Sequence, residues 1–483
     1  MIKKILLSLV ILISLFGCNK EEVYDSDVYY EIFVASFNDS DNDGIGDLKG
    51  VTLKLPYLKS LGIGGIWLMP IMKSETYHKY DVDNYYLIDS DYGTMDDFKE
   101  LVDKANELNI DIIIDLPLNH TSDSHEWFIS AKENKLNDTC NPDNKCDYYN
   151  FSDTKESGYE PLGDKYYYEA RFWSGMPDLN LDSENVRNEI KDIVEFWMDT
   201  GIKGFRLDAV LYYYQNNVSK NNEFVSWLME IVRNKREDAF VVGEVWSSEN
   251  IILDSYGSGI DSLFDFTMSG QDGFIAKAIR SENGQFLASK MIEYNDLIKE
   301  GSVNSIFLSN HDQSRSAGYF IDEDKQKLAA SVYLLSIGIP FVYYGEEIGM
   351  RGSGKDENKR LAMLWGEGSD TCSPIDSDYT SQVDTSVKEQ LKDENSLLNH
   401  YKKVIKLRNK YIYGKDYSEF IVDNEKIFSI NYEGNVVLIN MSEDIIEIDI
   451  KGKLLDQVDV IDKSVLKDKL AIGGYGVVIL EVE

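Results

Sequence analysis

The chain has 483 residues, which is too long for one ordinary hydrophobic core, so we expect two or three domains. Its hydrophobic content of 43% is that of a folded soluble protein. The formal net charge of −36 argues against a nucleic-acid partner, because phosphates require a basic surface, and against adsorption of the chain to anionic lipid. A neutral substrate is compatible with such a surface.

The N-terminus has the features of an export signal. Two lysines precede an apolar run over residues 5–16, which is too short to span a bilayer as a stable helix. The ending LFGC resembles a bacterial lipobox, in which Cys18 is lipidated and becomes the mature N-terminus. The alternative is an ordinary signal peptide with an incidental cysteine. We therefore expect residues 1–17 to be a signal peptide and the exported chain to attach to the bacterial membrane by its lipid anchor only.

After the signal, short apolar strands alternate with helical patterns such as those of residues 95–108 and 186–200. Near-continuous apolar strands that alternate with helices indicate a parallel sheet. Eight such units predict an α/β fold, a (β/α)₈ TIM barrel. The predicted strands cover residues 29–37, 64–70, 111–118, 204–210, 239–246, 262–266, 305–310 and 340–345.

Two further regions interrupt or follow this alternation. Residues 119–178, after the third strand, are polar, rich in tyrosine and too long for a plain loop, so they predict a small inserted domain. The last barrel helix is predicted at residues 396–411, and short β runs follow it. We expect a barrel formed by residues 24–118 and 179–411, and a C-terminal antiparallel β domain over residues 412–483.

Export makes disulfides possible. Cys140 and Cys146 bracket the turn-rich stretch NPDNK and could close a small ring, or they could remain two free thiols. Cys372 has no evident partner in the sequence, and no cysteine spacing matches a zinc site.

Charged and polar side chains occur at the ends of several predicted strands, where the catalytic groups of such a barrel are expected. One buried charge could be structural, but several at one barrel end are hard to explain by packing alone. They are Asp115, Asn119 and His120 after the third strand, Arg206 and Asp208 in the fourth, Glu244 in the fifth, and His311 and Asp312 after the seventh.

These residue types point to carboxylate chemistry. Glycoside hydrolysis needs one acid that protonates the leaving oxygen and one carboxylate that attacks the sugar or activates water. Arg206 and Asp208 lie two apart in a strand, on the same side, so the cation favours the ionised form of Asp208 that a nucleophile needs. Glu244 is flanked by Val245 and Trp246, and poorer solvation there suits a general acid.

The segments that carry these residues resemble, in order, four motif regions of the alpha-amylase family, family 13 of the glycoside hydrolases. Two more segments resemble the family's fifth motif and its eighth-strand region. The resemblance covers nearly the whole mature chain, and five motifs in order are highly specific. The segments are DLPLNH (115–120), GFRLDAV (204–210), GEVW (243–246), FLSNHD (307–312), MPDLN (176–180) and YYGEEIGM (343–350).

The resemblance implies a catalytic role for each matched carboxylate. Asp208 is expected to be the nucleophile that forms a β-glucosyl-enzyme, and Glu244 the acid/base. Asp312 is expected to hold sugar hydroxyls and strain the ring toward the transition state, while Arg206 keeps Asp208 ionised.

The resemblance also implies a set of substrate-binding side chains. His120 and His311 are expected to bind hydroxyls of the sugar being cleaved, and Tyr80 to stack under it with His78 beside it. Asp356 and Arg360, in DENKR, resemble a further pair at the same subsite.

An acidic stretch, DSDNDGIGD, follows the first predicted strand. Alternating carboxylates around a central glycine suit a hard cation such as Ca²⁺, and similar loops in the resembled family bind calcium at this place. A solvated acidic turn is the alternative. The expected ligands of a structural Ca²⁺ are Asp39, Asp41, Asp43, Asp47 and the backbone carbonyl of Ile45.

The motifs indicate the specific reaction less clearly than they indicate the family. MPDLN resembles the intermediate group that contains lipoprotein alpha-amylases and neopullulanases. YHKYDVDNYY (77–86) also resembles oligo-1,6-glucosidases, in which the aspartate after the tyrosine, here Asp81, helps to close off the non-reducing end. A surface enzyme meets polymers or long oligosaccharides, so we favour an alpha-amylase that cleaves α-1,4 bonds in starch, glycogen or maltooligosaccharides. The alternatives are an exo-acting oligosaccharide α-glucosidase, a neopullulanase or transferase, and a non-catalytic glucan-binding surface protein.

Overall fold

The structure is a computed structural model that describes residues 24–366 and 371–482. The predicted signal peptide and the predicted lipidation site at Cys18 lie outside these residues. Among the helices of the described part, none combines the length and the apolar character needed to cross a bilayer.

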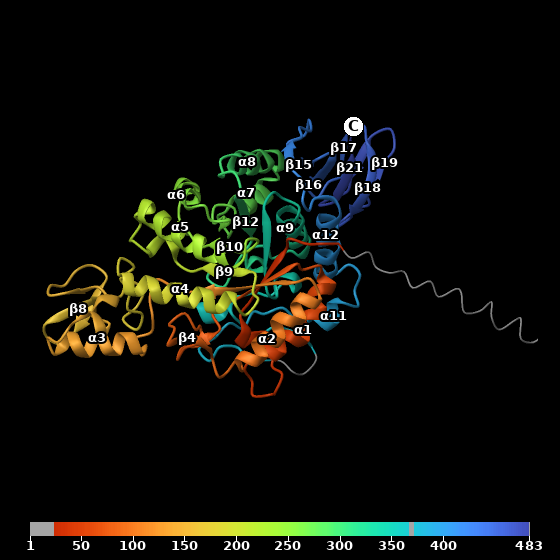
Figure 1. The fold of residues 1–483 in the computed structure, drawn as a ribbon. Coiled ribbons are helices and arrows are strands. Elements are labelled where there is room, and N and C mark those ends of the chain that lie inside the picture. The colour runs from red at the N-terminus through yellow and green to blue at the C-terminus, as the bar shows by residue number, and fades with distance from the viewer. Residues whose placement is uncertain (1–23, 367–370, 483) are drawn as a thin grey trace, which may run out of the picture.

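A closed barrel of parallel strands forms the centre of the molecule (Figure 1). The strand order is β1-β13-β12-β11-β10-β9-β5-β2, so the first strand pairs with both the second and the last and closes the barrel. All eight predicted barrel strands are present, and the (β/α)₈ fold is confirmed. The strands are β1 Tyr29–Ile32, β2 Gly65–Leu68, β5 Asp111–Leu116, β9 Gly204–Leu207, β10 Phe240–Gly243, β11 Ser262–Phe264, β12 Val303–Phe307 and β13 Ile339–Tyr343.

The strands are shorter than their apolar runs predict. β1 ends at Ile32, and a 3₁₀ turn, η1 (Val34–Ser36), replaces the rest of the predicted strand. Phe33 and Phe37 are nonetheless fully buried. An apolar run indicates that residues are buried, not that they form a strand. A buried loop that continues from a strand is apolar too, and the predicted strand is then too long.

Helices cover the outside of the barrel, and their ends are set by local capping. In α2 (Met95–Glu107), Thr94 and Asp97 form a reciprocal capping box. In α4 (Glu184–Met198), Ser183 accepts the N–H of Val186, so the helix begins two residues before the predicted position. The others are α1 Leu48–Leu61, α5 Val218–Lys235, α6 Glu249–Ser255, α7 Phe274–Ser281, α8 Gly284–Asp296, α9 Glu323–Leu334 and α12 Leu397–Tyr411, with short helices α10 Asp356–Lys359 and α11 Val387–Gln390.

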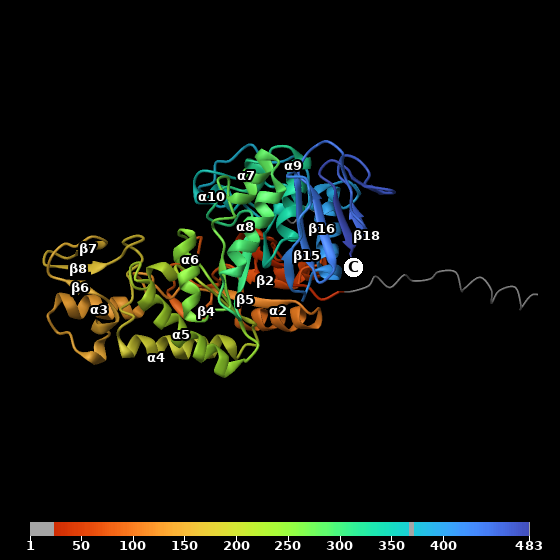
Figure 2. The same cartoon turned by 90° about the horizontal axis from the view of Figure 1, so that it is seen from above.

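Two excursions leave the barrel on the side of the strand C-termini. A hairpin of β3 (Met72–Lys73) and β4 (Asn84–Ile88) follows β2 and has no counterpart among the predicted elements. The second excursion follows β5 and lies at one end of the molecule (Figures 1 and 2). Backbone bridges between His120 and Asp178 and between Tyr149 and Leu179 close its base. It contains α3 Glu126–Leu136, 3₁₀ turns η2 Pro142–Asn144 and η3 Cys146–Tyr148, and an antiparallel sheet of β6 Phe151–Ser152, β8 Tyr166–Glu169 and β7 Tyr159–Leu162.

A disulfide joins Cys140 and Cys146 beside α3. Among the described residues Cys372 is a free, exposed cysteine.

The C-terminal region forms two antiparallel sheets at the other end of the molecule (Figure 1). Along β16, Val437 and Ile439 pack into the core shared with the barrel, whereas Val436 and Leu438 belong to a second core. This period of two is that of a strand buried on both faces. The larger sheet has the order β14 Tyr417–Glu419, β15 Ile427–Tyr432, β16 Asn435–Asn440, β21 Val477–Glu481 and β18 Lys453–Val458; the smaller has β17 Ile446–Ile448, β20 Leu470–Ile472 and β19 Val465–Leu466.

Candidate active site

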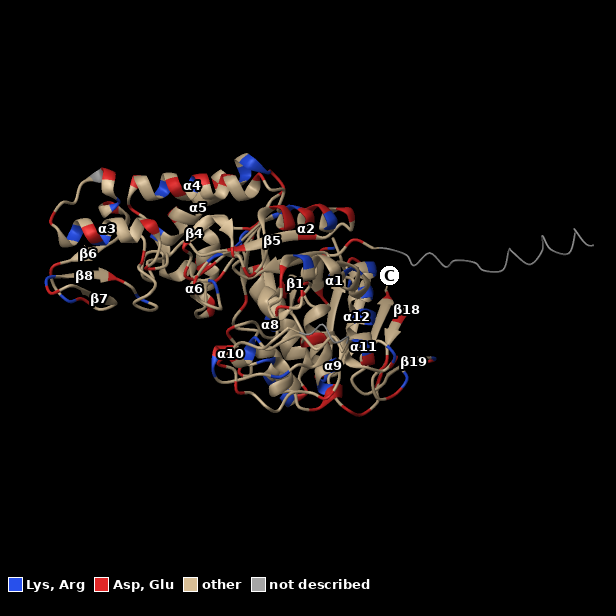
Figure 3. Cartoon of the chain, turned by 90° about the horizontal axis from the view of Figure 1, so that it is seen from below, with Lys and Arg blue, Asp and Glu red and all other residues tan. Residues whose placement is uncertain are grey.

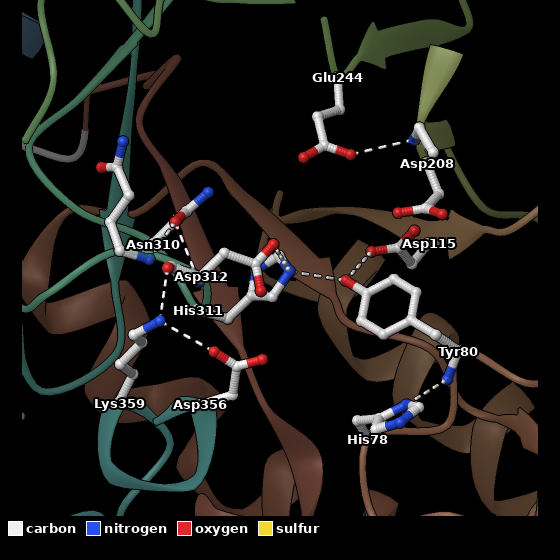
Figure 4. A network of polar contacts seen from close by, with 12 residues as sticks. His78, Tyr80, Asp115, Asp208, Glu244, Asn310, His311, Asp312, Asp356 and Lys359 are labelled. Atoms are coloured by element: carbon white, nitrogen blue, oxygen red, sulfur yellow. Dashed lines mark hydrogen bonds and ion pairs between the residues drawn. The ribbon is translucent and has the colours of Figure 1, made fainter. Parts of the chain in front are cut away.

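The charged side chains predicted at the strand ends converge at the C-terminal mouth of the barrel (Figure 4). Arg206, which is 1% exposed, lies among three carboxylates. Its Nη1 lies 2.6 Å from Oδ1 of Asp208 and 2.9 Å from Oδ1 of Asp115, and its Nη2 lies 2.9 Å from Oε2 of Glu244. One guanidinium therefore holds both the predicted nucleophile Asp208 and the predicted acid/base Glu244.

Strand register explains this convergence. Arg206 on β9 is the direct neighbour of Asp115 on β5 and of Val242 on β10. Arg206 and Asp208 point to the same side, as residues two apart in a strand do, although β9 itself ends at Leu207. The register of the parallel sheet thus places Asp115 beside Arg206, and Glu244 follows Val242 by two residues, just past the end of β10.

The chain turns sharply after Asp208. Ala209 adopts the left-handed conformation, with φ 49° and ψ 37°, which is uncommon for a residue with a side chain. Its backbone N–H donates to Oε2 of Glu244 at 3.0 Å. The turn therefore links the backbone next to one carboxylate to the side chain of the other.

Glu244 lies in an environment that favours its protonated form. Burial raises the pKa of Glu244, the cation of Arg206 opposes that effect, and the charges of Asp208 and Asp312 add to it. A carboxyl that keeps its proton more readily than usual, next to one that is paired with a cation, is the arrangement expected of an acid and a nucleophile.

His311 and Asp312 form a second charged group on the other side of the mouth. Nε2 of His311 lies 3.1 Å from Oδ2 of Asp312, and its Nδ1 lies 2.5 Å from Oε1 of Glu31 on β1. Burial alone lowers the pKa of His311, but these two carboxylates raise it to about 10. Burial also raises the pKa of Asp312, but His311 and Arg360 together lower it below its usual value. Asp312 is therefore ionised, with the guanidinium of Arg360 at 2.9 Å.

Tyr80 connects the two charged groups. Its hydroxyl contacts Nε2 of His311 at 2.8 Å and donates to Oδ2 of Asp115 at 3.1 Å. The rings of Tyr80 and His311 are stacked with centroids 5.7 Å apart. Nδ1 of His78 accepts the backbone N–H of Tyr80, and burial lowers the pKa of His78 to about 4, so this ring is neutral.

The ring nitrogens of His120 have unused hydrogen-bonding capacity. It is 2% exposed, and among the described residues neither of its ring nitrogens has a hydrogen-bond partner. Burial lowers the pKa of His120, so the ring is neutral and offers one donor and one acceptor. Because the ring lines the cavity described next, a polar ligand there can satisfy it.

A cavity of about 620 Å³ lies over these groups. Four aromatic side chains also line it, and only Trp246, the neighbour of Glu244, is marked by the sequence motifs. They are Phe172, Trp173, Tyr212 and Trp246, which are between 40% and 53% exposed. Apolar rings left open around a polar centre suit the faces of sugar rings. The predicted residues that line the cavity are His78, Tyr80, His120, Asp208, Glu244, Asp312, Asp356 and Arg360.

Asp81 is placed differently from these residues. It is 3% exposed and does not line the cavity. Its Oδ1 accepts hydrogen bonds from the hydroxyls of Ser74, at 2.8 Å, and of Thr76, and lies 3.8 Å from Nδ1 of His78. In this structure Asp81 supports the loop that carries His78 and Tyr80.

The acidic loop after β1 gathers three of its four aspartates. One carboxylate oxygen from each of Asp39, Asp41 and Asp43 lies within 4.8 Å of the others, which fits a small cation. Burial raises the pKa of Asp39, but the backbone N–H groups of Gly44 and Asn42 outweigh it and lower that pKa. Asp47 caps α1, with its Oδ1 accepting the N–H of Gly50 at 2.7 Å, and that Asp47 and the carbonyl of Ile45 also bind the ion stays a prediction.

Comparison with known proteins agrees with this geometry. A family model described as "Alpha amylase, catalytic domain" matches residues 31–415. Alpha-amylase 3 of Dictyoglomus thermophilum is 40% identical over 438 residues, which are 85% of this chain and 83% of that protein. An oligo-1,6-glucosidase of Bacillus cereus is 28% identical over 508 residues, covering 85% of this chain and 88% of that protein. The solved structure of Eubacterium rectale Amy13B superposes with a TM-score of 0.90 at 37% identity, over 95% of this chain and 97% of that one.

Proposed function

Because the chain belongs to the alpha-amylase family and is a glycosidase, we propose that it cleaves α-1,4-glucosidic bonds in starch, glycogen or maltooligosaccharides with retention of configuration. The observation that carries this proposal is the single guanidinium of Arg206 that binds both Asp208 and Glu244. Carboxylates that share one guanidinium are close neighbours, as in retaining glycosidases, whose two carboxyl groups lie about 5–5.5 Å apart.

The reaction proceeds in two displacements. Glu244 gives its proton to the glycosidic oxygen while Asp208 attacks the anomeric carbon, and the bond from that carbon to the oxygen breaks. Glu244, now ionised, takes a proton from water, which attacks the same carbon and releases Asp208. Two inversions at one carbon restore its original configuration.

The other groups of the mouth bind and orient the sugar. Asp312 is ionised and offers acceptors to sugar hydroxyls, while His120 offers one donor and one acceptor without an internal partner. Arg206 stays charged throughout, so it limits the cost of the negative charge that moves between Asp208 and Glu244. Water release from the aromatic lining strengthens each of these polar contacts.

The position of Asp81 favours the alpha-amylase over the exo-acting oligosaccharide α-glucosidase. An aspartate that closes off the non-reducing end must reach the bound sugar, whereas Asp81 is buried outside the cavity and its Oδ1 accepts hydrogen bonds from Ser74 and Thr76. The cavity is also rimmed by four exposed aromatic side chains, which offer surface to more than one glucose unit. These features support our proposal that the chain degrades polymers, and the MPDLN segment supports the proposed place among lipoprotein alpha-amylases.

Two accompanying features belong to the same proposal. Asp39, Asp41 and Asp43 would hold a structural Ca²⁺, which would neutralise three carboxylates in a short loop. Lipidation of Cys18 would hold the exported enzyme at the bacterial membrane. Both would leave the cavity at the barrel mouth open to a large substrate.

The experiment that tests the proposal uses maltoheptaose with its non-reducing end blocked, beside the unblocked sugar, in the presence of calcium. Internal fragments from the blocked sugar, with the α-anomer released first, are the expected result. Cleavage of the unblocked sugar alone, with glucose as the early product, would establish the exo-acting α-glucosidase instead. Binding of either sugar without any release would establish the non-catalytic alternative.

A further inference from the structure

A second cavity, of about 720 Å³, lies between α1 and α12 on the outside of the barrel. Five lysines and one glutamate line it, although acidic residues outnumber basic ones by 85 to 49 in the whole chain. We call this cavity the lysine groove. Its charged residues are Lys59 on α1, Lys402, Lys403 and Lys406 on α12, and Lys392 and Glu394 between α11 and α12.

The lysines of the groove make no close ion pair in the part of the chain that the structure describes, and the acid that acts on Lys59, Asp25, does so from a longer distance. Within the described residues, no ion pair of 4.0 Å or less involves any of the five, and Lys403 donates only to the backbone carbonyl of Glu394. Elsewhere lysines pair closely, as Lys191 does with Glu195 and Lys203 with Asp238. In a strongly acidic protein, five like charges around one concavity are a concentration of positive potential that an anion can neutralise.

The arrangement of α12 directs three of these charges outward together. Lys402, Lys403 and Lys406 occupy the face opposite Val404 and Ile405, which are fully buried against the barrel. Residues at this spacing share one side of a helix. The groove is therefore a fixed feature of a well-anchored helix, and Figure 3 marks basic residues on both α1 and α12.

The position of the groove relates it to the N-terminus. Tyr24, the first described residue, lines the groove, so the preceding 23 residues join the fold at this point. Cys18 is six residues upstream of Tyr24, and six residues span at most roughly 20 Å. A lipid on Cys18 would thus hold the groove within reach of a bilayer. α1 and α12 lie at the end of the molecule away from the inserted segment of α3 and β8 (Figure 1).

We propose that the lysine groove docks the enzyme on an anionic membrane surface and takes up phosphate head groups of its lipids. The docking rests on the lipid anchor of the proposed function but is a separate interaction. The net charge of −36 does not prevent it, because charges beyond about 8 Å from the surface are screened at physiological ionic strength, and the groove is the part brought closest. Docked in this way, the enzyme directs its barrel mouth away from the bilayer.

The test uses the chain from residue 24, which contains every described element, with a hexahistidine tag in place of the lipid anchor. The tag binds vesicles of phosphatidylcholine that carry a nickel-chelating lipid, with or without about 30% phosphatidylglycerol. We expect phosphatidylglycerol to strengthen binding by about 10-fold or more near 0.1 M salt, because each lysine near an anionic surface adds attraction. Equal binding to the two kinds of vesicle would overturn the proposal.

Two variants of equal net charge separate the groove from general electrostatics. In the first, Lys59, Lys392, Lys402, Lys403 and Lys406 become glutamine, and the preference for phosphatidylglycerol is expected to disappear. In the matched control, the exposed lysines Lys99, Lys155, Lys451, Lys463 and Lys467 become glutamine, and the preference is expected to remain. Equal losses in both variants would assign the effect to total charge and overturn the proposal.

Two further readouts identify the partner and separate this proposal from the proposed function. Inorganic polyphosphate is the soluble probe. If it binds the groove and phosphatidylglycerol vesicles do not, the partner is a soluble polyanion, and the docking proposal is overturned. Hydrolysis of maltoheptaose in solution is expected to be the same for the parent chain and both variants. A parent chain that docks without hydrolysing maltoheptaose would contradict the proposed function alone.

Discussion

The backbone N–H of Ala209 donates a hydrogen bond to Oε2 of Glu244 at 3.0 Å, and Ala209 makes this bond from a left-handed conformation with φ 49°. The residue that directly follows Asp208, the proposed nucleophile, therefore holds the side chain of the proposed acid/base. Local backbone strain of this kind persists where the surrounding structure imposes it, and it clusters at functional sites.

This relationship predicts that Ala209→Val lowers kcat by about 10- to 100-fold, because a β-branched residue in the left-handed region costs roughly 1–3 kcal/mol and the turn shifts to relieve it. Ala209→Asn is the matched control, since asparagine tolerates this conformation and is similar in size to valine. The measurement is the hydrolysis rate of maltoheptaose for both variants. If both lose the same activity, bulk in the cavity rather than backbone geometry is responsible.

The acid/base assignment predicts that Glu244→Ala affects substrates according to their leaving group. Hydrolysis of maltoheptaose should fall by about 10³-fold or more, because the alkoxide leaving group needs a proton. An α-maltosyl fluoride needs no such proton, so its first displacement should be far less affected. Azide should accelerate turnover by displacing Asp208 from the β-glycosyl-enzyme, and this second inversion should yield the α-glycosyl azide. Product analysis by NMR checks the configuration. A β-glycosyl azide, or an equal loss on both substrates, would contradict the assignment.

Glu346 predicts a pH dependence of stability that is unrelated to catalysis. Burial raises the pKa of Glu346 from 4.5 to about 7, although its carboxylate accepts hydrogen bonds from Ser309 and Tyr333. A raised carboxyl pKa favours the protonated folded state, so stability is fully present below about pH 4.5 and declines as the pH rises through 7. The free energy of unfolding should fall by on the order of 3 kcal/mol across this window.

Glu346→Gln should reduce the measured decline by on the order of 3 kcal/mol. It should not abolish the decline, because burial also raises the pKa values of Asp115 and Asp178 to about 7. Glu300→Gln, at an exposed position, should leave the decline unchanged. The measurement is chemical denaturation from pH 4.5 to 8.5 for the three proteins. A decline of equal size in Glu346→Gln would place its origin at another buried acid.

The cluster of Asp39, Asp41 and Asp43 predicts that chelation lowers the melting temperature by several degrees and that calcium restores it. Asp41→Asn and Asp43→Asn should weaken this response, since both side chains are exposed and their replacement leaves the buried Asp39 in place. Thermal unfolding with EDTA and with added Ca²⁺ measures the effect. A melt that EDTA leaves unchanged would count against a structural ion.

The sequence predicts the parts of this protein that depend on local pattern. Each barrel strand corresponds to an apolar run, and Arg206 and Asp208 share a side because strand periodicity requires it. Side-chain contacts that form only when the barrel closes cannot be predicted from local pattern. Glu31 appears as one acid in a tyrosine-rich strand, yet it contacts His311, 280 residues later, and orients that ring.

The contacts made by loop residues could not be predicted from local pattern either. Asp47 caps α1 and Asp81 supports a turn, and their motifs do not reveal these contacts, because a short acidic side chain serves backbone and hydroxyl donors as readily as a ligand. Phe172 and Trp173 are two adjacent aromatic residues in a polar loop. This pairing was the one sequence signal that could have marked the cavity rim, where both rings are exposed.

The contact between Glu31 and His311 has a consequence for when the molecule first becomes active. β1 must pair with β13, which is made after His311, before Glu31 reaches its place. An unfinished chain on a ribosome therefore carries all three carboxylates without the site they form. The site is complete only when the last barrel strand joins the first.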